Sequence, residues 1–167
     1  MKDKDIAGLA CLHWTSPLGP MLLAATDRGL AGLWFEGQRH GPDASGWPED
    51  PAHPVLRAAV GQLQEYFAGQ RTAFSLPLDL RLGTAFQQSV WQALLAIPAG
   101  RTTSYAELGR RLGRPQAARA VGAAVGRNPV SIVVPCHRVL GTAGALTGYA
   151  GGLERKSALL RLEGTRS

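Results

Sequence analysis

The sequence predicts an α+β protein, with a small antiparallel sheet and one helix in residues 1–80 and a mainly helical second domain in residues 81–167. Two observations predict this division. Three short apolar runs separated by turn residues open the chain. Apolar residues at helical spacing, interrupted by turns that contain Gly or Pro, fill its second half. A chain of 167 residues can form one substantial core or two small ones.

The three apolar runs cover residues 9–14, 21–25 and 30–35. Turn-forming residues separate them, with Ser16-Pro17-Leu18-Gly19-Pro20 after the first run and Asp27-Arg28-Gly29 after the second. Short strands joined by short turns commonly pair with their neighbours in sequence. We therefore expect an antiparallel meander of three strands.

The remainder of the first half predicts a loop, a helix and a linker. Residues 37–54 are rich in Gly, Pro and Asp, which is typical of a loop. Residues 55–68 place their apolar side chains at helical spacing. Residues 69–83 predict a strand or a linker, and we expect the domain boundary near residue 80.

A pair of helices joined by a tight turn is predicted in the second half. Thr84 can cap a preceding helix over residues 85–97, and Thr103 or Ser104 begins a short helix that ends near residue 112. Pro115 suits the first position of the next helix, which reaches about residue 126. These last two helices form a candidate helix-turn-helix.

The final part of the chain predicts one more strand and one more helix. Ile132-Val133-Val134 is a short apolar run that predicts a buried strand leading to Cys136. Residues 152–162 predict an amphipathic helix, which Glu163-Gly164 ends.

The net charge of +6 is distributed unevenly. Residues 1–80 carry six Lys/Arg and nine Asp/Glu, whereas residues 81–167 carry twelve Lys/Arg and three Asp/Glu. The net charges are therefore −3 and +9, and almost every basic residue of the second half is arginine. Arginine pairs with phosphate in a bidentate fork and stacks on bases, which favours a nucleic-acid partner. A solvated basic surface is the alternative interpretation of the same composition.

The composition excludes disordered and membrane-spanning classes. Apolar residues make up 45% and charged residues 18% of the chain, as in globular proteins. No apolar run approaches the roughly 20 residues that a membrane span needs. The first residues are not followed by the apolar region of a signal peptide, so we expect a cytoplasmic protein with free thiols.

Cys136 and His137 are the candidate reactive pair. Each is the only residue of its type in the basic half. A thiol becomes a good nucleophile when a base and a positive environment help to remove its proton, and His137 and Arg138 could supply these. A buried cysteine beside an unrelated histidine is the alternative. Cys11 and His13 do not form a convincing metal site, so we expect no metal.

A third member of the site would be a carboxylate that orients the imidazole of His137. The basic half contains Glu107, Glu154 and Glu163. Glu107 is predicted inside a helix, Glu154 near the start of the last helix and Glu163 at its end. The sequence pattern does not choose among them.

The second helix of the helix-turn-helix has unusually small side chains. It reads Pro115-Gln116-Ala117-Ala118-Arg119-Ala120-Val121-Gly122-Ala123-Ala124. Such a surface permits close approach, either to another helix in the core or to a ligand. Arg119 is its one long cation, and it could insert into a groove or a base stack.

These residues resemble the O6-alkylguanine-DNA alkyltransferases, also called methylated-DNA–protein-cysteine methyltransferases. The resemblance covers most of residues 84–167 and, more loosely, the strands from Ser16 onward. Its most specific run is Ile132-Val133-Val134-Pro135-Cys136-His137-Arg138-Val139. The other matching motifs are Thr103-Ser104-Tyr105, Ala118-Arg119-Ala120-Val121-Gly122, Asn128-Pro129, Gly148-Tyr149-Ala150-Gly151-Gly152 and Leu159-Leu160-Arg161-Leu162-Glu163.

The resemblance implies a catalytic role for five residues. Cys136 would accept the alkyl group, His137 would act as a base through a water molecule, and Glu163 would orient His137. Asn128 would brace the turn that carries the site. Tyr105 would donate its phenolic proton toward the guanine.

The resemblance also implies how the substrate is bound. Arg119 would fill the gap left by a flipped base, and the carbonyls of Cys136 and Val139 would accept from the guanine amino group. Tyr149 and Gly151 would line the pocket. Ala150 stands where some relatives have a serine, so a hydrogen bond to O6 there would come from the backbone. The further residues expected at the DNA are Ala117, Ala118, Ala120 and Gly122.

The fold and partner implied by the resemblance are a ribonuclease H-like first domain, a winged-helix-like second domain and double-stranded DNA. We expect a monomer that binds the minor groove largely without regard to sequence. Small apolar side chains cannot read the hydrogen-bonding code of the major groove. The transfer would need no cofactor and would consume the protein, because a thioether has no easy hydrolytic exit.

Two other functions compete with this interpretation. A helix-turn-helix regulator without chemistry would explain the basic half and Arg119, but not Cys136, His137 and Glu163 together. A cysteine hydrolase would explain those three residues, but not the arginine-rich surface.

Overall fold

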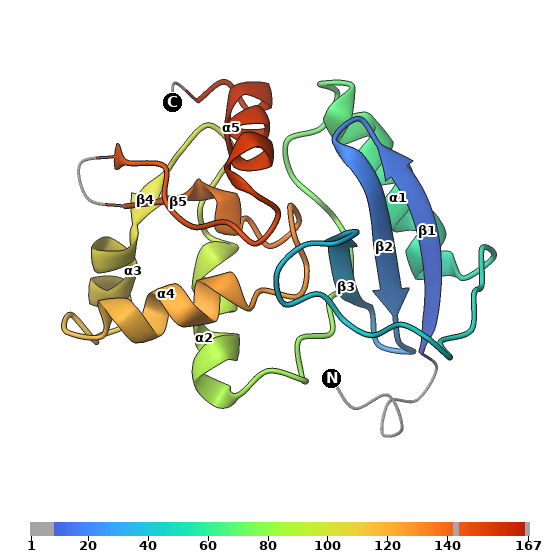
Figure 1. Ribbon diagram of the computed structural model, residues 1–167, viewed down its shortest axis with the longest axis horizontal. Helices are drawn as coiled ribbons and strands as arrows, with labels where there is room; N and C mark the ends of the chain where they lie inside the picture. Colours follow the sequence, from blue (N-terminus) through green and yellow to red (C-terminus); the bar gives the residue numbers. More distant parts are fainter. Residues whose placement is uncertain (1–8, 142–143, 166–167) are drawn as a thin grey trace.

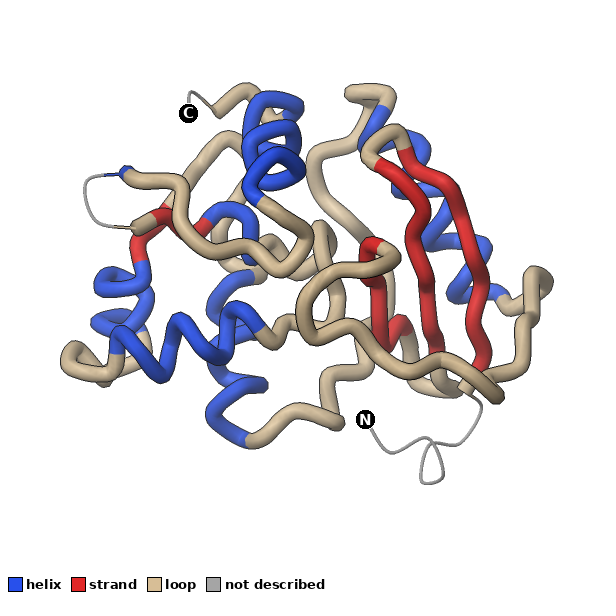
Figure 2. The backbone as a smooth tube through the Cα atoms, in the orientation of Figure 1, coloured by secondary structure: helices blue, strands red, loops and turns tan. Residues whose placement is uncertain are grey.

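The computed structural model describes residues 9–141 and 144–165. A three-stranded sheet and its helix α1 form one side of the molecule, and helices α2 to α5 form the other (Figures 1 and 2). The α+β fold predicted from the sequence is confirmed. Among the described residues, no helix is long and apolar enough to cross a membrane.

The sheet is an antiparallel meander of the order β1-β2-β3. Its strands are β1 (Ala10–Ser16), β2 (Gly19–Ala25) and β3 (Leu30–Phe35), which confirms the three predicted strands. Ser16 stabilises the tight turn between β1 and β2, because its hydroxyl accepts from Leu18 N and donates to the Gly19 carbonyl. Gly19 has a φ of +119°, which favours glycine at this position.

Both faces of the sheet are covered. Leu23 and Leu33 belong to the main core with α1 (Pro54–Phe67), whereas Leu22 and Trp34 pack with Trp47 in a second, smaller cluster. Side chains alternate between the two faces of a strand, so neighbouring residues enter different clusters. The predicted loop over residues 37–54 is therefore the cover of one sheet face.

The linker after α1 leads to α2 (Ala85–Leu94). Residues 69–83 form a linker rather than a full strand, with one isolated bridge from Leu78 to Leu30. Thr84 caps α2 as predicted, in a reciprocal capping box with Gln87. The helix ends at Leu94 and not at residue 97, because the amides of Ala96 and Ile97 bond to carbonyls three residues back, in tighter turns. Ile97 also precedes Pro98, which disfavours the helical conformation there.

The helix-turn-helix consists of α3 (Tyr105–Arg111) and α4 (Ala118–Gly126). Ser104 caps α3 through the Glu107 amide. The prediction that Pro115 begins the second helix is wrong. Ala117 N donates to the Arg114 carbonyl at 3.0 Å, so Pro115 occupies the second position of a β-turn, where proline is favoured.

Before this chain reaches its last helix, it forms a buried turn. The strand predicted at Ile132-Val133-Val134 is wrong: these residues are buried, but they turn, and Ile132 has a φ of +71°. A short 3₁₀ helix η2 (Cys136–Arg138) follows, and then β5 (Val139–Leu140) pairs in parallel with β4 (Thr103–Ser104).

The two halves share one continuous apolar core. The main cluster includes Leu33 and Leu63 from the first half and Leu108 and Leu159 from the second. The edge of β3 also bonds to the second half, because Leu33 N donates to the Pro129 carbonyl and Leu33 O accepts from Ser131 N. The domain boundary near residue 80 stays a prediction. The last helix is α5 (Leu153–Leu162), as expected.

Candidate active site around Cys136

Cys136 lies at the start of η2, directly after the buried turn. It is 6% exposed and lines a cavity of about 320 Å³. Three of the residues that we expected around a bound base line the same cavity: Tyr105, Tyr149 and Ala150. Gly122, which we expected at the DNA, lines it as well. Arg39, His40, Ala123, Val125, Gly126, Arg127 and Gly148 complete its wall.

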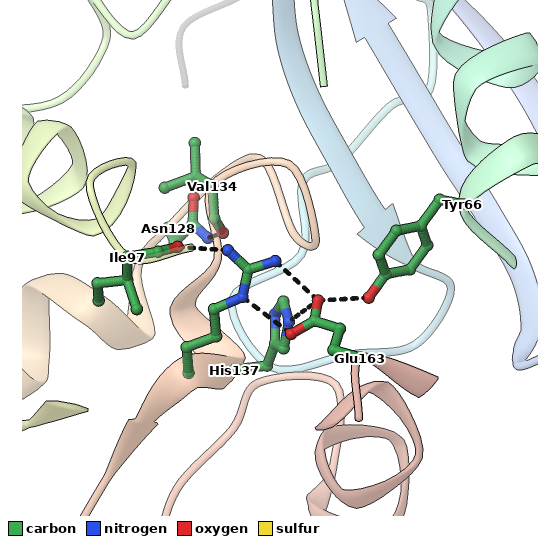
Figure 3. Close-up of polar contacts among 7 residues, drawn as sticks. Tyr66, Ile97, Asn128, Val134, His137 and Glu163 are labelled. Atoms are coloured by element: carbon green, nitrogen blue, oxygen red, sulfur yellow. Dashed lines mark hydrogen bonds and ion pairs between the residues drawn. The ribbon is translucent and has the colours of Figure 1, made fainter. Parts of the chain in front are cut away.

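Asn128 closes the turn that carries Cys136. Its side chain is buried, accepts from Val130 N at 3.0 Å, and donates to the Val134 carbonyl at 2.8 Å (Figure 3). These bonds join the two ends of the turn, and they satisfy backbone groups that burial would otherwise leave unpaired. The side chain of Asn128 also fixes the direction in which the chain enters Cys136.

His137, the residue after Cys136, is in direct contact with Glu163. His137 Nε2 lies 2.8 Å from Glu163 Oε2, and both side chains are almost completely buried (Figure 3). The pattern of residues left three carboxylates open and the resemblance implied Glu163, which is the one that contacts His137 in the structure. Glu107 pairs with Arg110 and Arg111 on the surface, and Glu154 is exposed in the first turn of α5.

Arg138 holds the carboxylate of Glu163, which its position in the sequence did not indicate. Its guanidinium donates Nε to Glu163 Oε1 at 2.9 Å and Nη2 to Oε2 at 2.8 Å, and Nη1 donates to the Ile97 carbonyl. A bidentate arginine compensates a buried carboxylate better than a single point charge does. Arg138 therefore holds Glu163 in place rather than facing a substrate.

Burial favours the neutral forms of the Cys136 thiol and the His137 imidazole. It raises the pKa of the Cys136 thiol to about 11, although Asn128 and Lys156 act in the opposite direction. It also lowers the pKa of His137, against the stabilising effect of Glu163 on the imidazolium. Burial would raise the pKa of Glu163, but hydrogen bonds from Arg138, His137 and Tyr66 outweigh it and lower this pKa to about 2. With this pKa the Cys136 thiol is protonated near neutral pH, and it would need a base to become a nucleophile.

Lys156 is a buried cation that the sequence reasoning missed. Its Nζ donates to the carbonyls of Val139, Thr147 and Gly148 at 2.6, 2.8 and 3.4 Å. These bonds tie the loop after β5 to α5. The residue could have been noticed from the sequence, because it lies three residues before Leu159 and so on the apolar face of the last helix.

Val139 and Gly151, which we also expected at the pocket, are not among the described residues that line the cavity. Tyr105 is the first residue of α3, and burial raises the pKa of its phenol. A side chain at Gly122 would begin 3.7 Å from the Tyr105 ring. At Gly151, a Cβ would lie 2.7 Å from Tyr149, so only glycine fits without a shift. The Val139 carbonyl is buried and already accepts from Lys156.

The exposed face of α4 borders the cavity. Ala118, Arg119 and Ala120 are exposed in its first turn, and Ala117 is half-buried at the N-cap. Further along, Gly122, Ala123 and Gly126 line the cavity itself. Arg119 is therefore on the same helix as the cavity wall but outside the wall.

Both cysteines, Cys11 and Cys136, are free and buried. Within residues 9–141 and 144–165, no group of three or more His, Cys, Asp or Glu side chains could hold a metal ion. The described part of the site is thus built from a thiol, an imidazole, a carboxylate and the groups that hold them.

Known proteins resemble this chain along nearly its whole length. Residues 11–80 match the ribonuclease-like domain of 6-O-methylguanine DNA methyltransferase, and residues 85–165 match its DNA binding domain. A methylated-DNA–protein-cysteine methyltransferase of Mycobacterium bovis is 52% identical over 152 residues, or 91% of this chain and 90% of the relative. A relative with the same name from Methanosarcina acetivorans is 47% identical and covers 90% of this chain and 95% of its own length.

Solved structures agree with this similarity. OGT of Mycobacterium tuberculosis in complex with DNA superposes with a TM-score of 0.85 at 50% identity and covers 92% of each chain. The O6-methylguanine-DNA methyltransferase of Pyrococcus kodakaraensis strain KOD1 has the same fold, with a TM-score of 0.66 at 24% identity, over 94% of this chain and 99% of its own. The chain therefore belongs to the methylated-DNA–protein-cysteine methyltransferases, the O6-alkylguanine-DNA alkyltransferase family.

Proposed function

We propose that this protein repairs alkylated DNA by moving the alkyl group from O6 of guanine to the Sγ atom of Cys136. The carbon–oxygen bond of the damaged base breaks and a carbon–sulfur bond forms. The thiol loses its proton, and guanine leaves with a proton restored to its ring system. No external oxidant, reductant or cofactor is needed for this balance.

The observation that carries the proposal is the position of Cys136. Its thiol lines a cavity beside the exposed face of α4, while His137 and Glu163 lie behind it. A base within DNA is stacked and paired, so it must leave the helix before its O6 substituent can meet a thiol. A cavity of about 320 Å³ next to a candidate DNA-binding helix is a suitable place to receive it.

His137 is the base in this proposal, acting through a water molecule. Its Nε2 contacts the ionised Glu163, which favours the tautomer with the proton on Nε2. Its Nδ1 is then a free acceptor, and it has no hydrogen-bond partner among the described residues. Tyr105, which lines the cavity, would donate toward the departing guanine and make it a better leaving group.

We further propose that α4 docks in the minor groove of double-stranded DNA and that one protein molecule acts alone. The exposed side chains of its first turn are Ala118, Arg119 and Ala120. The alanines offer no hydrogen-bonding groups for reading base edges, but they allow close approach in a narrow groove. Arg119 would enter the stack in place of the flipped base. Affinity would come mainly from phosphate contacts and would fall as salt increases.

Intact-protein mass spectrometry tests the proposal directly. The protein is mixed with a duplex oligonucleotide that contains O6-methylguanine, and the modified peptide is then identified. We expect a lasting gain of one methyl group on Cys136, and no gain in the Cys136→Ser protein. DNA binding without any gain would support a regulator instead, and a transient adduct would support a hydrolase.

A further inference from the structure

Tyr66 connects the first half of the chain to the active site. It lies on α1 and is 2% exposed. Its ring packs edge-on against Phe67 and beside Phe74, with centroids 5.3 and 5.4 Å away. Its hydroxyl donates to Glu163 Oε2 at 2.6 Å (Figure 3). A rigid side chain of the N-terminal core therefore reaches the carboxylate behind His137.

The Glu163 carboxylate is held from two directions. His137 Nε2 and both donating nitrogens of Arg138 come from η2, within the second half of the chain. The Tyr66 hydroxyl comes from α1 and shares Oε2 with His137 and with one nitrogen of Arg138. Because three donors meet on one oxygen, a change in any of them alters how strongly Oε2 accepts hydrogen bonds from the other two.

We propose that Tyr66 is a positioning residue for alkyl transfer: its hydroxyl fixes the Glu163 carboxylate and takes up part of its negative charge, so that the N-terminal half sets how tightly His137 holds a proton. This inference rests on the proposed function, in which His137 removes the proton of Cys136. It adds a role in the reaction to the first half of the chain, which also contributes Arg39 and His40 to the wall of the cavity.

The charges around His137 determine the direction of the effect. Glu163 favours the imidazolium, whereas Arg138 and Lys156 disfavour it, and burial lowers the pKa of His137 more than any of these groups changes it. Cys136 precedes His137 directly. Burial and the adjacent Glu163 raise the pKa of Tyr66, so its hydroxyl remains a neutral donor. Without this hydroxyl, Oε2 would present more of its charge to His137, and the pKa of His137 would rise.

The first test measures the thiol without any DNA. Iodoacetamide alkylation of Cys136 is followed by peptide mass spectrometry over a range of pH in the wild type and in Tyr66→Phe. Protonation of His137 removes the base, so it produces the acid limb of this profile. We expect Tyr66→Phe to move this limb to higher pH by roughly half a unit, the size expected for losing one shared hydrogen bond.

A matched control separates positioning from packing. Leu56 is completely buried on α1, near the opposite end of the helix from Tyr66. Leu56→Val should lower the thermal stability of the protein but leave the acid limb where it is in the wild type. An equal shift in Leu56→Val, or no shift in Tyr66→Phe, would overturn the proposal.

The second test uses the duplex with O6-methylguanine and a double-mutant cycle. Tyr66→Phe should shift the acid limb of methyl transfer as it does with iodoacetamide, but should add no further shift when Glu163 is already Gln. If Tyr66→Phe shifts the acid limb equally in the wild type and in Glu163→Gln, Tyr66 does not act through Glu163. If the wild type reacts with iodoacetamide but takes no methyl group from DNA, the proposed function fails, and the iodoacetamide profiles still decide the role of Tyr66.

Discussion

The two cysteines of this protein occupy opposite environments in spite of similar burial. Cys11 is 2% exposed and packs with Trp34 and Trp47 on the outer face of the sheet. Cys136 is 6% exposed and lines the cavity beside α4. Burial raises the pKa of both thiols, so burial does not distinguish them.

The groups next to each thiol do distinguish them. The nearby charge at Cys11 is Glu49, which raises the pKa of the thiol further. At Cys136, Asn128 and Lys156 lower the pKa of the thiol, against the effect of burial. His137, the next residue in the chain, contacts Glu163. A thiolate formed at Cys136 meets a cation, whereas one formed at Cys11 meets a carboxylate. The comparison indicates that the exposed fraction of a thiol does not by itself set its reactivity. A cavity that a substrate can enter and the sign of the neighbouring charge matter as well.

The largest expected difference comes from replacing each thiol by an alcohol. Cys136→Ser should abolish methyl transfer, because a hydroxyl is far less acidic and less nucleophilic than a thiol. Cys11→Ser should retain transfer. Single-turnover assays measure the loss, and fluorescence anisotropy with the same duplex checks that DNA binding persists. Stoichiometric repair by Cys136→Ser would remove the basis of the comparison.

The next effect concerns His137, the proposed base. His137→Phe should slow transfer by roughly 10²- to 10⁴-fold, the usual contribution of a general base. Glu163→Gln should slow transfer less than His137→Phe does. It should also shift the pH profile of transfer, because it removes a carboxylate that has a pKa of about 2 and is ionised throughout the assay range. Thermal unfolding identifies any loss of fold. Wild-type rates in both variants would contradict the triad while leaving Cys136 as a candidate acceptor.

Access to Cys136 from DNA is tested at Arg119. Arg119→Ala should slow repair of duplex DNA by about tenfold, because base flipping costs a few kcal/mol and, in the proposed function, the guanidinium offsets part of this cost. Reaction with free O6-methylguanine should change little, since no base has to be flipped. The ratio of the two rates is the measurement. An equal loss on both substrates would place Arg119 in the fold or the chemistry instead.

A smaller effect is expected from the small residues of α4. Ala118→Leu should weaken duplex binding several-fold, because a larger side chain on the exposed first turn prevents close approach to the groove. Reaction with the free base should be retained. Ala118 is a better test than Gly122, whose added side chain would also approach the Tyr105 ring. A salt titration of the affinity accompanies the variant, and affinity that is independent of salt would argue against phosphate contacts.

The smallest effect is expected at Cys11 itself. Cys11→Ala should cost about 1 kcal/mol of stability, because it leaves a small gap in the apolar cluster without breaking a catalytic contact. Its transfer rate on the duplex should equal that of the wild type. Chemical denaturation and the single-turnover assay measure the two quantities. A slower Cys11→Ala protein of unchanged stability would show that the sheet cluster affects the active site.

Local patterns in the sequence determined much of the fold. Strands β1 to β3 and helix α1 follow from apolar periodicity and turn residues, which act over a few neighbouring positions. The caps at Thr84 and Ser104 were likewise predictable, because a capping side chain bonds to an amide three residues away. The sequence also singled out Cys136 with His137, since the two are adjacent in the chain.

Where long-range contacts compete with local preference, only the tertiary structure decided. Ile132, Val133 and Val134 have a typical strand composition, but Asn128 and the edge of β3 impose a turn on this segment. Pro115 is a different case, because it is compatible with a helix start and with a β-turn, which are both local structures. The structure has the turn, with its local bond from Ala117 N to the Arg114 carbonyl.

The site shows the same division. A pattern of residue types cannot measure distance between segments far apart in the chain, so by pattern alone three carboxylates were equivalent. The family resemblance implied Glu163, and the structure places this residue against His137. The contact from Tyr66, 97 residues earlier, has no local signal at all. The sequence by itself determined which residues could react, and folding decided which carboxylate, which phenol and which buried cations surround them, because those contacts exist only after distant segments pack together.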